Sequence, residues 1–418
     1  MKETKFKNTE IGEIPKDWKM YSIGKDCSVK ARIGWQGLTT SEYLQTGHYG
    51  LITSTDLIEG KVNWDTCVFV SEERYKQDTN IIVKNGDVLV SKDGTIGKVA
   101  VVSNLQYPTT LNSGVFVIRT KNEKITQEGL GLVFISPYFK DFIKRLTAGS
   151  TIVHLYQKDI VNFTFPIPTL PEQHHIASAL TSIDNLISSL GKLIEKKKNI
   201  KQGAMQQLLT GETRLKGFDE PWMEHTIDEL FDLGNGYTPS KSNPAYWTNG
   251  TIPWFRMEDI RTNGRILKDS IQHVTPEAVK GNGLYPKYSI ILSTTATIGE
   301  HALLIADSLA NQQFTFLNRK VNRRDMIDII FFYHYCFILG KWCRDNINAG
   351  GLLAVNMDDL KNHSIYIPKS IAEQQAIATI LTKMDDEIAA LEAKKAKYEA
   401  IKQGMMQQLL TGKIRLIS

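Results

Sequence analysis

Cysteine is scarce in this chain, and apolar runs long enough to cross a membrane are absent. The four cysteines, Cys27, Cys67, Cys336 and Cys343, form no Cys-x-x-Cys pair and show no zinc-type spacing with histidine, so we expect free thiols in a reducing compartment. The most apolar run, 329–339, is about half of what a bilayer requires and predicts a buried helix. The N-terminus lacks a signal-peptide stretch, so we expect a cytoplasmic protein without a membrane segment.

The motifs of common cofactor and catalytic sites are also missing. The sequence contains no Gly-x-x-x-x-Gly-Lys phosphate loop and no Gly-x-Ser-x-Gly elbow, and its one adjacent histidine pair, 174–175, would point about 100° apart on a helix. Residues 232–236 and 243–246 resemble two methyltransferase motifs, but they lie too close together for the intervening strands and helices of such an enzyme. We therefore predict no metal site, no bound cofactor and no catalytic residues.

Composition and charge point to an ordinary globular protein. The 418 residues are 42% hydrophobic and 23% charged, which predicts two to four domains that each close a core. The net charge is +5 and the sequence pI is about 8.7. So small a surplus favours a polyanionic partner only if the cations cluster.

An internal repeat is the strongest signal in the sequence. Residues 200–211 return almost unchanged as residues 401–412, 201 positions later. Upstream of this block the same offset pairs Glu172 with Glu373. Closer to the N-terminus of each copy, the offset changes by only a residue or two. A period this long excludes a solenoid, so each copy is a domain with an appended element.

Both copies carry an apolar spacing that predicts a long helix. From 176 to 194, apolar residues recur alternately four and three positions apart, as in the seam of a coiled coil, and the second copy repeats this register from 377 to 391. The first helix is expected to run from 172 to 209. At about 1.5 Å per residue the first helix would be roughly 57 Å long. Gly211 and Gly412 are suited to end the helices in a left-handed conformation. The predicted seam residues are Ile176, Leu180, Ile183, Ile187, Leu190, Ile194, Ile377, Leu381, Met384, Ile388 and Leu391.

Each seam needs a partner. We expect the two helices to pair with each other, antiparallel and within one chain, because a fused duplication holds them at high effective concentration. The alternatives are that each helix packs on its own domain or that two chains pair. The predicted fold class is α+β, with two pseudo-twofold-related domains separated by two long antiparallel coiled-coil helices.

The residues before each helix predict an α+β domain with a curved antiparallel sheet. Strands are expected at 88–91, 98–102, 114–119, 290–293, 301–305 and 314–317, and helices at about 130–146 and 325–347. Because the two frames match while their exposed residues differ, they are expected to present different recognition surfaces. Polar and basic loop residues are the candidates, since such side chains hold phosphates and read base edges. The candidates are Arg32, Trp35, Gln36, Ser54, Lys61, Ser91, Lys92, Tyr156, Gln157, Lys241, Arg256, Arg261, Arg265, Lys268, Thr294, Thr295 and Asn356.

With these features in order across two copies, the whole chain resembles the specificity subunit of type I restriction-modification enzymes. The resemblance is carried by residues 11–18, 236–241, 243–247 and 252–254, together with the starts and ends of both predicted helices. The first copy departs from the pattern, because residues 33–36 replace the Thr-Pro-Ser-Lys run of the second copy.

The resemblance implies a non-catalytic subunit that recognises a two-part target in double-stranded DNA. Each domain would be a target recognition domain for one half-site, and the paired helices would set the gap and dock two modification methyltransferase subunits. Restriction motor-nuclease subunits would join for cleavage, and S-adenosylmethionine, ATP and Mg would be used by those partners and not by this chain. The implied divisions are a first recognition domain at 1–168, a central helical spacer at 169–216, a second recognition domain at 217–368 and a C-terminal helical spacer at 369–418.

Two other functions stay open from the sequence. One is a coiled-coil scaffold that joins two protein-binding domains without touching DNA. The other is a self-contained modification enzyme.

Overall fold

The computed structural model describes residues 4–147, 154–281, 283–348 and 353–417, and the Trp35 side chain lies outside the described part. The chain forms two compact units, Met1–Gly191 with Ala393–Ser418, and Lys192–Glu392. Each unit therefore combines one α+β domain with a part of both long helices.

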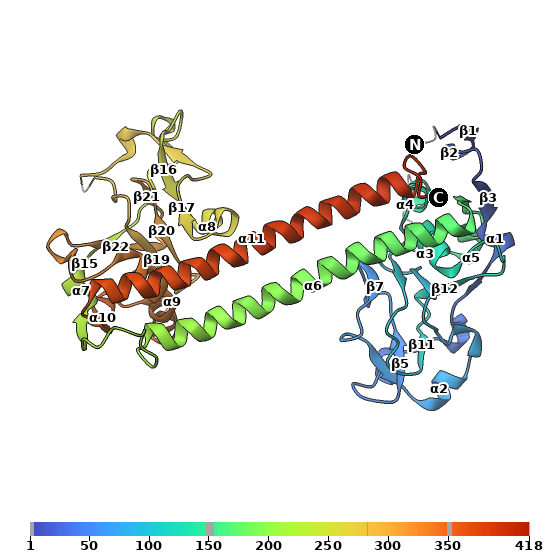
Figure 1. The fold of residues 1–418 in the computed structure, drawn as a ribbon, viewed down its shortest axis with the longest axis horizontal. Helices are drawn as coiled ribbons and strands as arrows, with labels where there is room; N and C mark the ends of the chain where they lie inside the picture. The colour runs from blue at the N-terminus through green and yellow to red at the C-terminus, as the bar shows by residue number, and fades with distance from the viewer. Residues whose placement is uncertain (1–3, 148–153, 282, 349–352, 418) are drawn as a thin grey trace. The chain divides into compact units, whose positions relative to one another are not determined.

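The first unit is built on two sheets (Figure 1). The larger has six strands in the order β4 (Cys27–Lys30), β12 (Val115–Thr120), β9 (Val88–Ser91), β10 (Val99–Val101), β7 (Gly60–Val62) and β6 (Leu57–Ile58). The smaller has the order β11 (Thr109–Leu111), β5 (Tyr49–Ile52) and β8 (Val68–Val70). Its other elements are β1 (Phe6–Thr9), β2 (Gly12–Pro15), β3 (Lys19–Ser22), β13 (Thr164–Ile167), α1 (Ile23–Asp26), α2 (Glu72–Lys76), α3 (Gln127–Ile135), α4 (Pro137–Thr147) and α5 (Gln157–Ile160).

The central strands of the six-stranded sheet are buried on both faces. Val88 and Val90 join the apolar cluster under α3 and α4, whereas Leu89 and Val117 join a second cluster on the opposite face. Alternate side chains of a strand point to opposite faces. A strand covered on both faces reads as a continuous apolar run, which is the pattern at 88–91.

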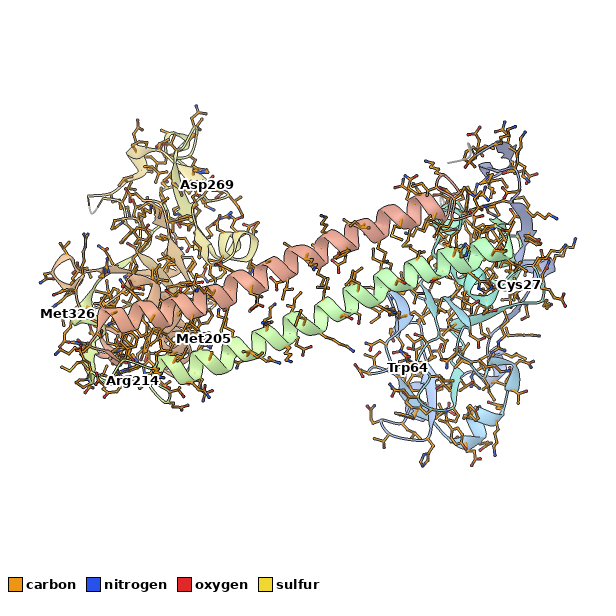
Figure 2. All side chains as sticks on the ribbon, in the orientation of Figure 1. Cys27, Trp64, Met205, Arg214, Asp269 and Met326 are labelled. Carbon is orange, nitrogen blue, oxygen red and sulfur yellow. The ribbon has the colours of Figure 1, made fainter. Side chains whose placement is uncertain are left out.

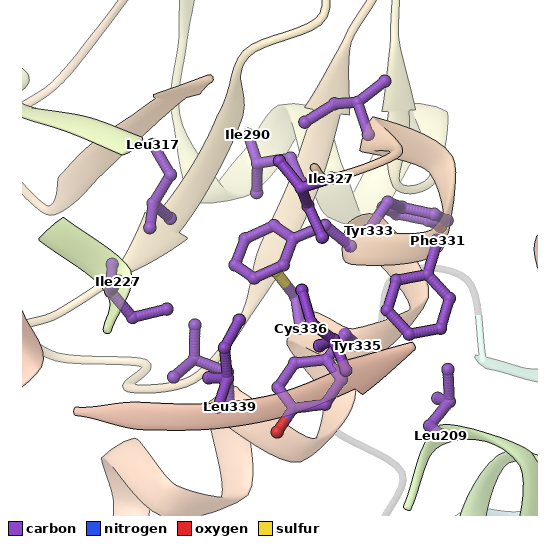
Figure 3. Close-up of a cluster of buried hydrophobic side chains, with 14 of the residues drawn as sticks. Leu209, Ile227, Ile290, Leu317, Ile327, Phe331, Tyr333, Tyr335, Cys336 and Leu339 are labelled. Atoms are coloured by element: carbon purple, nitrogen blue, oxygen red, sulfur yellow. The ribbon is translucent and has the colours of Figure 1, made fainter. Parts of the chain in front are cut away.

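The second unit repeats the plan. Its larger sheet has the order β15 (Phe231–Asn235), β22 (Phe314–Arg319), β19 (Ile290–Ser293), β20 (His301–Leu304) and β17 (Ile266–Leu267), and its smaller sheet has the order β18 (His273–Val274), β16 (Ile252–Phe255) and β21 (Leu309–Ala310). The other elements are β14 (Trp222–Thr226), β23 (Ile347–Asn348), β24 (Ala354–Val355), β25 (Ser364–Pro368), α7 (Ile227–Leu230), α8 (Met257–Asn263), α9 (Ile329–Asp345) and α10 (Met357–Asn362). Figure 3 shows Ile290 and Leu317 of the sheet packed against Cys336 and Leu339 of α9.

The structure corrects two of the sequence predictions and confirms a third. The sheets are not purely antiparallel, because β7 pairs with β10 and β17 with β20 in parallel. The helix expected at 130–146 is two helices, since Ser136 precedes Pro137 and adopts an extended conformation that ends α3. The buried helix expected at 329–339 is confirmed as part of α9.

Both long helices are confirmed as α6 (Leu170–Leu209) and α11 (Ile371–Leu409). In the first unit Ile176 near the start of α6 shares a buried cluster with Leu409 at the end of α11. In the second unit Ile377 near the start of α11 shares a cluster with Leu209. Start meets end in both units, so within each unit the pairing is antiparallel and belongs to one chain (Figure 1).

The predicted seam is the inner face of these helices. Eight of its members are buried, and Ile187, Met384 and Leu391 are partly buried. Gly211 and Gly412 have φ values of +77° and +69°, as expected of left-handed helix ends. The α+β fold class and the doubled plan are therefore confirmed.

Candidate nucleic-acid interface

The first turn of each long helix anchors its domain through a buried carboxylate. In the first unit the Glu172 side chain is fully buried and accepts hydrogen bonds from Arg415 Nε at 2.7 Å and from Trp18 Nε1 at 3.1 Å. Arg415 also donates to Asp17 at 2.6 Å, which holds the pKa of the Asp17 carboxyl below its usual range. The hydrogen bond to Glu172 is the main cause of the raised Arg415 pKa. This tail residue therefore joins the last segment of the chain to the first domain.

The second unit repeats the anchor, with Arg214 located 201 positions before Arg415 and Glu373 located 201 positions after Glu172. The buried Glu373 carboxylate accepts two hydrogen bonds of 2.7 Å from Arg214. This hydrogen bonding raises the Arg214 pKa. Figure 2 labels Arg214 and also Met326, whose carbonyl accepts a hydrogen bond from Gln374 Nε2 at 2.9 Å. The sequence analysis missed both arginines, although the 201-residue offset relates Arg214 to Arg415 and could have found them.

A second repeated ion pair crosses between the helices. Lys402 Nζ lies 2.6 Å from Asp184 Oδ1 in the first unit, and Lys201 lies 2.5 Å from Asp385 in the second. Both pairs obey the 201-residue offset, so they fix the same register of α6 against α11 twice. The domains are thus held on their helices in equivalent ways.

Four predicted DNA contacts are buried: Arg32, Gln36, Ser91 and Thr294. The Arg32 guanidinium donates to the carbonyl of Leu111 at 2.9 Å, and burial lowers its pKa. Ser91 Oγ donates to the Thr95 carbonyl at 2.6 Å, inside the turn between β9 and β10. These side chains support loops from within and do not face outward.

The other candidates are exposed or half-buried. Lys61, Tyr156, Gln157, Lys241, Arg261 and Lys268 are exposed, and Ser54, Lys92, Arg256, Arg265, Thr295 and Asn356 are half-buried. Arg256 pairs with Glu258 at 2.8 Å and Arg265 with Glu300 at 2.6 Å. Asn356 caps α10 through its side-chain oxygen.

The structure brings some candidates together at the same place in both domains. In the first, Asp93 forms a β-bridge with His154 and the Leu155 amide donates to the Lys92 carbonyl at 2.7 Å, which sets Lys92 near Tyr156. In the second, Thr295 forms a bridge with Ala354 and the Val355 amide donates to the Thr294 carbonyl at 2.9 Å. We call these two places the loop pairs: 92–95 with 154–157, and 294–297 with 354–357.

A cleft of about 760 Å³ separates the second domain from its helices. Its cations are Lys198, Lys201, Arg265, Lys341 and Arg344, and its one carboxylate is Asp385. Within the described ranges, Lys341 and Arg344 have no ion pair. Lys201 and Arg265 each lie 5.2 Å from the centre of the Phe337 ring, a cation–π geometry. This cleft carries a positive charge that the sequence analysis only partly identified.

A cleft of about 850 Å³ beside the helices of the first unit is lined by as many carboxylates as cations. Lys61, Lys140 and Lys402 are balanced by Glu59, Glu128 and Asp184. Val99 stands where the second copy has His301, and Gly131 where it has Tyr333, as the alignment of Thr126 with Asp328 shows. The two domains therefore present different chemistry beside equivalent helix faces.

Two buried histidines in the second unit predict acid sensitivity. His301 and His334 are each 1% exposed, and burial lowers both pKa values to about 3. Unfolded histidine has a pKa of about 6.5, so as pH falls below that value the unfolded state binds more protons and the free energy of unfolding falls. Val99 and Leu132 stand at the equivalent positions of the first copy. The substitutions His301→Val and His334→Leu should each reduce this loss of unfolding free energy by roughly 1.4 kcal/mol per pH unit. Thermal unfolding between pH 6.5 and 4.5 measures the slope, and a slope equal to wild type would contradict the prediction.

No group of three or more metal-ligating side chains is arranged to hold an ion in the described part of the chain. Among the described helices, none is both long and apolar enough for a membrane span.

Known proteins show the same organisation. A family model described as the type I restriction modification DNA specificity domain matches residues 15–201 and again residues 219–402. The chain is 46% identical over 185 residues to the EcoprrI specificity subunit of Escherichia coli, a match that covers 43% of this chain and 46% of that relative. It is 26% identical to the MjaX specificity subunit of Methanocaldococcus jannaschii over 99% of this chain and 98% of that one. The S subunit of a type I system from M. genitalium shares the fold, with a TM-score of 0.57 at 16% identity over 94% of this chain and 96% of that one.

Proposed function

Because the chain belongs to the type I restriction-modification DNA specificity family, it is a DNA specificity subunit, and we propose that each of its two domains reads one half of a two-part target in double-stranded DNA. One observation carries the proposal. The loop pairs occupy the same place in both domains, yet Lys92 and Asp93 in one correspond to Thr294 and Thr295 in the other. Lys92, Asp93 and Thr295 are half-buried and Thr294 is buried, so equivalent frames carry different polar groups, as two different half-sites require.

The proposed DNA contacts are the exposed and half-buried candidates. They are Ser54, Lys61, Lys92, Tyr156, Gln157, Lys241, Arg256, Arg261, Arg265, Lys268, Thr295 and Asn356. To them we add Lys341 and Arg344, which lack ion pairs among the described residues. Lys341 would bind a phosphate through its ammonium group, and Arg344 through the two-pronged edge of its guanidinium group. Arg32, Gln36, Ser91 and Thr294 would instead shape the loops that carry the contacts.

The proposed divisions of the chain are recognition domains at 1–168 and 217–368 and helical spacers at 169–216 and 369–418. The 40 residues of α6 give a length of roughly 60 Å at about 1.5 Å per residue. At about 3.4 Å per base pair this is a reach of roughly 18 base pairs. We propose that the paired helices set the gap between the half-sites.

The proposed partners are two modification methyltransferase subunits, docked on the helices, and restriction motor-nuclease subunits. S-adenosylmethionine, ATP and Mg would be used by these partners. We propose that the protein works in the cytoplasm, where it would meet DNA.

Exchanging residues 217–368 for the second domain of another family member tests the proposal. The expected result is a methylated site in which one half changes and the other half and the gap stay, because each domain acts through its own loops. Sequencing the methylated bases in a host that carries the system measures this. Unchanged methylation at both half-sites would contradict it.

The scaffold alternative needs a direct control. Duplex DNA titrated onto the full chain at two salt concentrations should bind more weakly at high salt, since phosphate contacts release counterions. A scaffold without DNA contact would show no binding at either concentration.

A further inference from the structure

The loop pair of the first domain carries an acidic side chain that the second domain lacks at the same place. Asp93 and His154 face each other across the β-bridge of this loop pair, and His154 Nδ1 donates a hydrogen bond of 2.7 Å to Asp93 Oδ1. The Asp93 side chain is 36% exposed and the His154 side chain 52% exposed. The corresponding bridge of the second domain joins Thr295 to Ala354, which cannot form such a pair. The two loop pairs therefore differ in a charged group that a ligand can reach.

The turn that contains Asp93 is held by other groups. Ser91 Oγ donates to the Thr95 carbonyl at 2.6 Å and accepts a hydrogen bond from the Lys98 amide at 2.9 Å. The Ser91 carbonyl accepts a third hydrogen bond from the Gly97 amide at 3.0 Å. An aspartate that shapes a turn accepts a hydrogen bond from a nearby backbone amide. Within the described ranges no amide donates to the Asp93 carboxylate, so the turn does not explain the aspartate.

The second oxygen of this carboxylate is accessible. His154 occupies Oδ1, whereas Oδ2 makes no hydrogen bond with any residue that the structure describes. Gly114 lies beside it, and an added Cβ there would be 3.5 Å from Oδ2, so glycine leaves this side clear. The second domain has Gln313 at this place, since the amides that precede Asp93 and Thr295 donate to the Gly114 and Gln313 carbonyls. The Gln313 side chain donates hydrogen bonds to its own loop and covers it.

A carboxylate in a loop that meets DNA needs a specific reason, because phosphates repel it. In the major groove the amino groups of cytosine N4 and adenine N6 are donors that a carboxylate can accept from. Adenine carries the N7 acceptor beside its amino group, so an amide side chain, which both accepts and donates, suits adenine better. Cytosine offers only its amino group in this groove. A carboxylate therefore favours cytosine.

We propose that Asp93 reads a cytosine in the half-site of the first domain by accepting a hydrogen bond from the N4 amino group through Oδ2. His154 is the positioning residue, because its hydrogen bond to Oδ1 holds the carboxylate in one orientation. This inference rests on the proposed function and specifies one base pair, C·G, in one half-site. The second domain, with Thr295 and Ala354 at the same place, does not make this choice.

Asp93→Asn tests the inference, because asparagine keeps the shape of the side chain and can bond N6 and N7 of adenine together. Methylome sequencing of a host that carries the complete system should find a C·G pair with wild type and an A·T pair at the same position with the variant. The affected half-site should be the one that exchange of residues 217–368 leaves unchanged. In titrations of the full chain with duplexes that differ only at this pair, the preference for cytosine should fall by about 5- to 150-fold.

Asp141→Asn is the matched control. Asp141 is an exposed carboxylate on α4 of the same unit and has no ion pair among the residues that the structure describes, so the change in net charge is the same. It should keep the wild-type site and the wild-type preference for cytosine. An equal loss of preference in both variants would show that net charge sets the preference, and would overturn the inference.

Two substitutions of His154 test the positioning role. His154→Ala should weaken the preference for cytosine without creating a new preferred base, since the carboxylate loses its fixed orientation. His154→Asn should restore part of the preference, because its amide can donate to Asp93. The side chains are accessible, so these variants should unfold at the wild-type temperature. If Asp93→Asn unfolded at a lower temperature, the comparison of the two His154 variants would decide.

The outcomes separate this inference from the proposed function. A two-part methylated site whose first-domain half contains no C·G pair would overturn the inference and leave the proposed function standing. The same holds if Asp93→Asn recognises the wild-type site with unchanged preference. A host in which no two-part site is methylated would overturn the proposed function itself.

Discussion

Replacing Arg415 with alanine is expected to lower the free energy of unfolding of the first unit by about 3–5 kcal/mol. The substitution leaves the Glu172 carboxylate, whose side chain is 0% exposed, without its charged partner. It also releases the tail from Asp17, which Arg415 contacts at 2.6 Å. A buried charge that loses its partner keeps its desolvation cost, so the loss is large. Calorimetric unfolding of the full chain would measure it.

Two variants show whether the buried carboxylate is the cause. Asp17→Ala removes a carboxylate that is 49% exposed and should cost less than about 1 kcal/mol. Glu172→Gln combined with Arg415→Met removes both charges and should recover most of the stability. If Arg415→Ala alone unfolded within 1 kcal/mol of wild type, the anchor would be unimportant.

Lengthening both helices is expected to abolish recognition of the natural site and create a longer one. Four residues added within 184–195 and within 385–396 extend each helix by about 6 Å, close to two base pairs. They also rotate the ends by only about 40°, since 3.6 residues make a turn. Methylome sequencing of a host with this variant should find the same half-sites with a wider gap.

The register of the seam provides the control for this experiment. Seven residues keep the four-three spacing and should widen the gap by about 10 Å, or three base pairs. An insertion in one helix alone shifts half of the seam, including the Lys402–Asp184 pair, and should destroy the pairing. An unchanged gap with normal activity in the doubly extended chain would rule out a ruler.

The elements that the sequence predicted well are those with a strict period. The seam of α6 repeats every seven residues, and the helix was predicted to start at residue 172, two residues after its observed start. The strand β9 is a continuous apolar run in the sequence because both its faces are covered. The parallel pairing of β7 with β10 could not be predicted, because strand partners far apart in sequence leave no local pattern.

The predicted site was harder to foresee than the fold. Arg32 was expected to face DNA because arginine side chains hold phosphates and read base edges, but it is 1% exposed and donates a hydrogen bond to the Leu111 carbonyl. Lys341 and Arg344 lie on a helix that reads as apolar, so their place in a basic cleft depends on tertiary packing. Residue type shows which side chains could contact a polyanion, and only the folded chain shows which of them reach the surface.

The first compact unit includes residues 393–418, which a ribosome makes after the whole of the second unit, residues 192–392. During translation the N-terminal domain emerges long before Arg415 and the closing turns of α11, so its Glu172 lacks its charged partner for most of synthesis. Domains ordinarily mature in the order of their synthesis. Here the unit that starts first is completed after the second unit, and a stop codon placed before Arg415 would remove a part of the first unit.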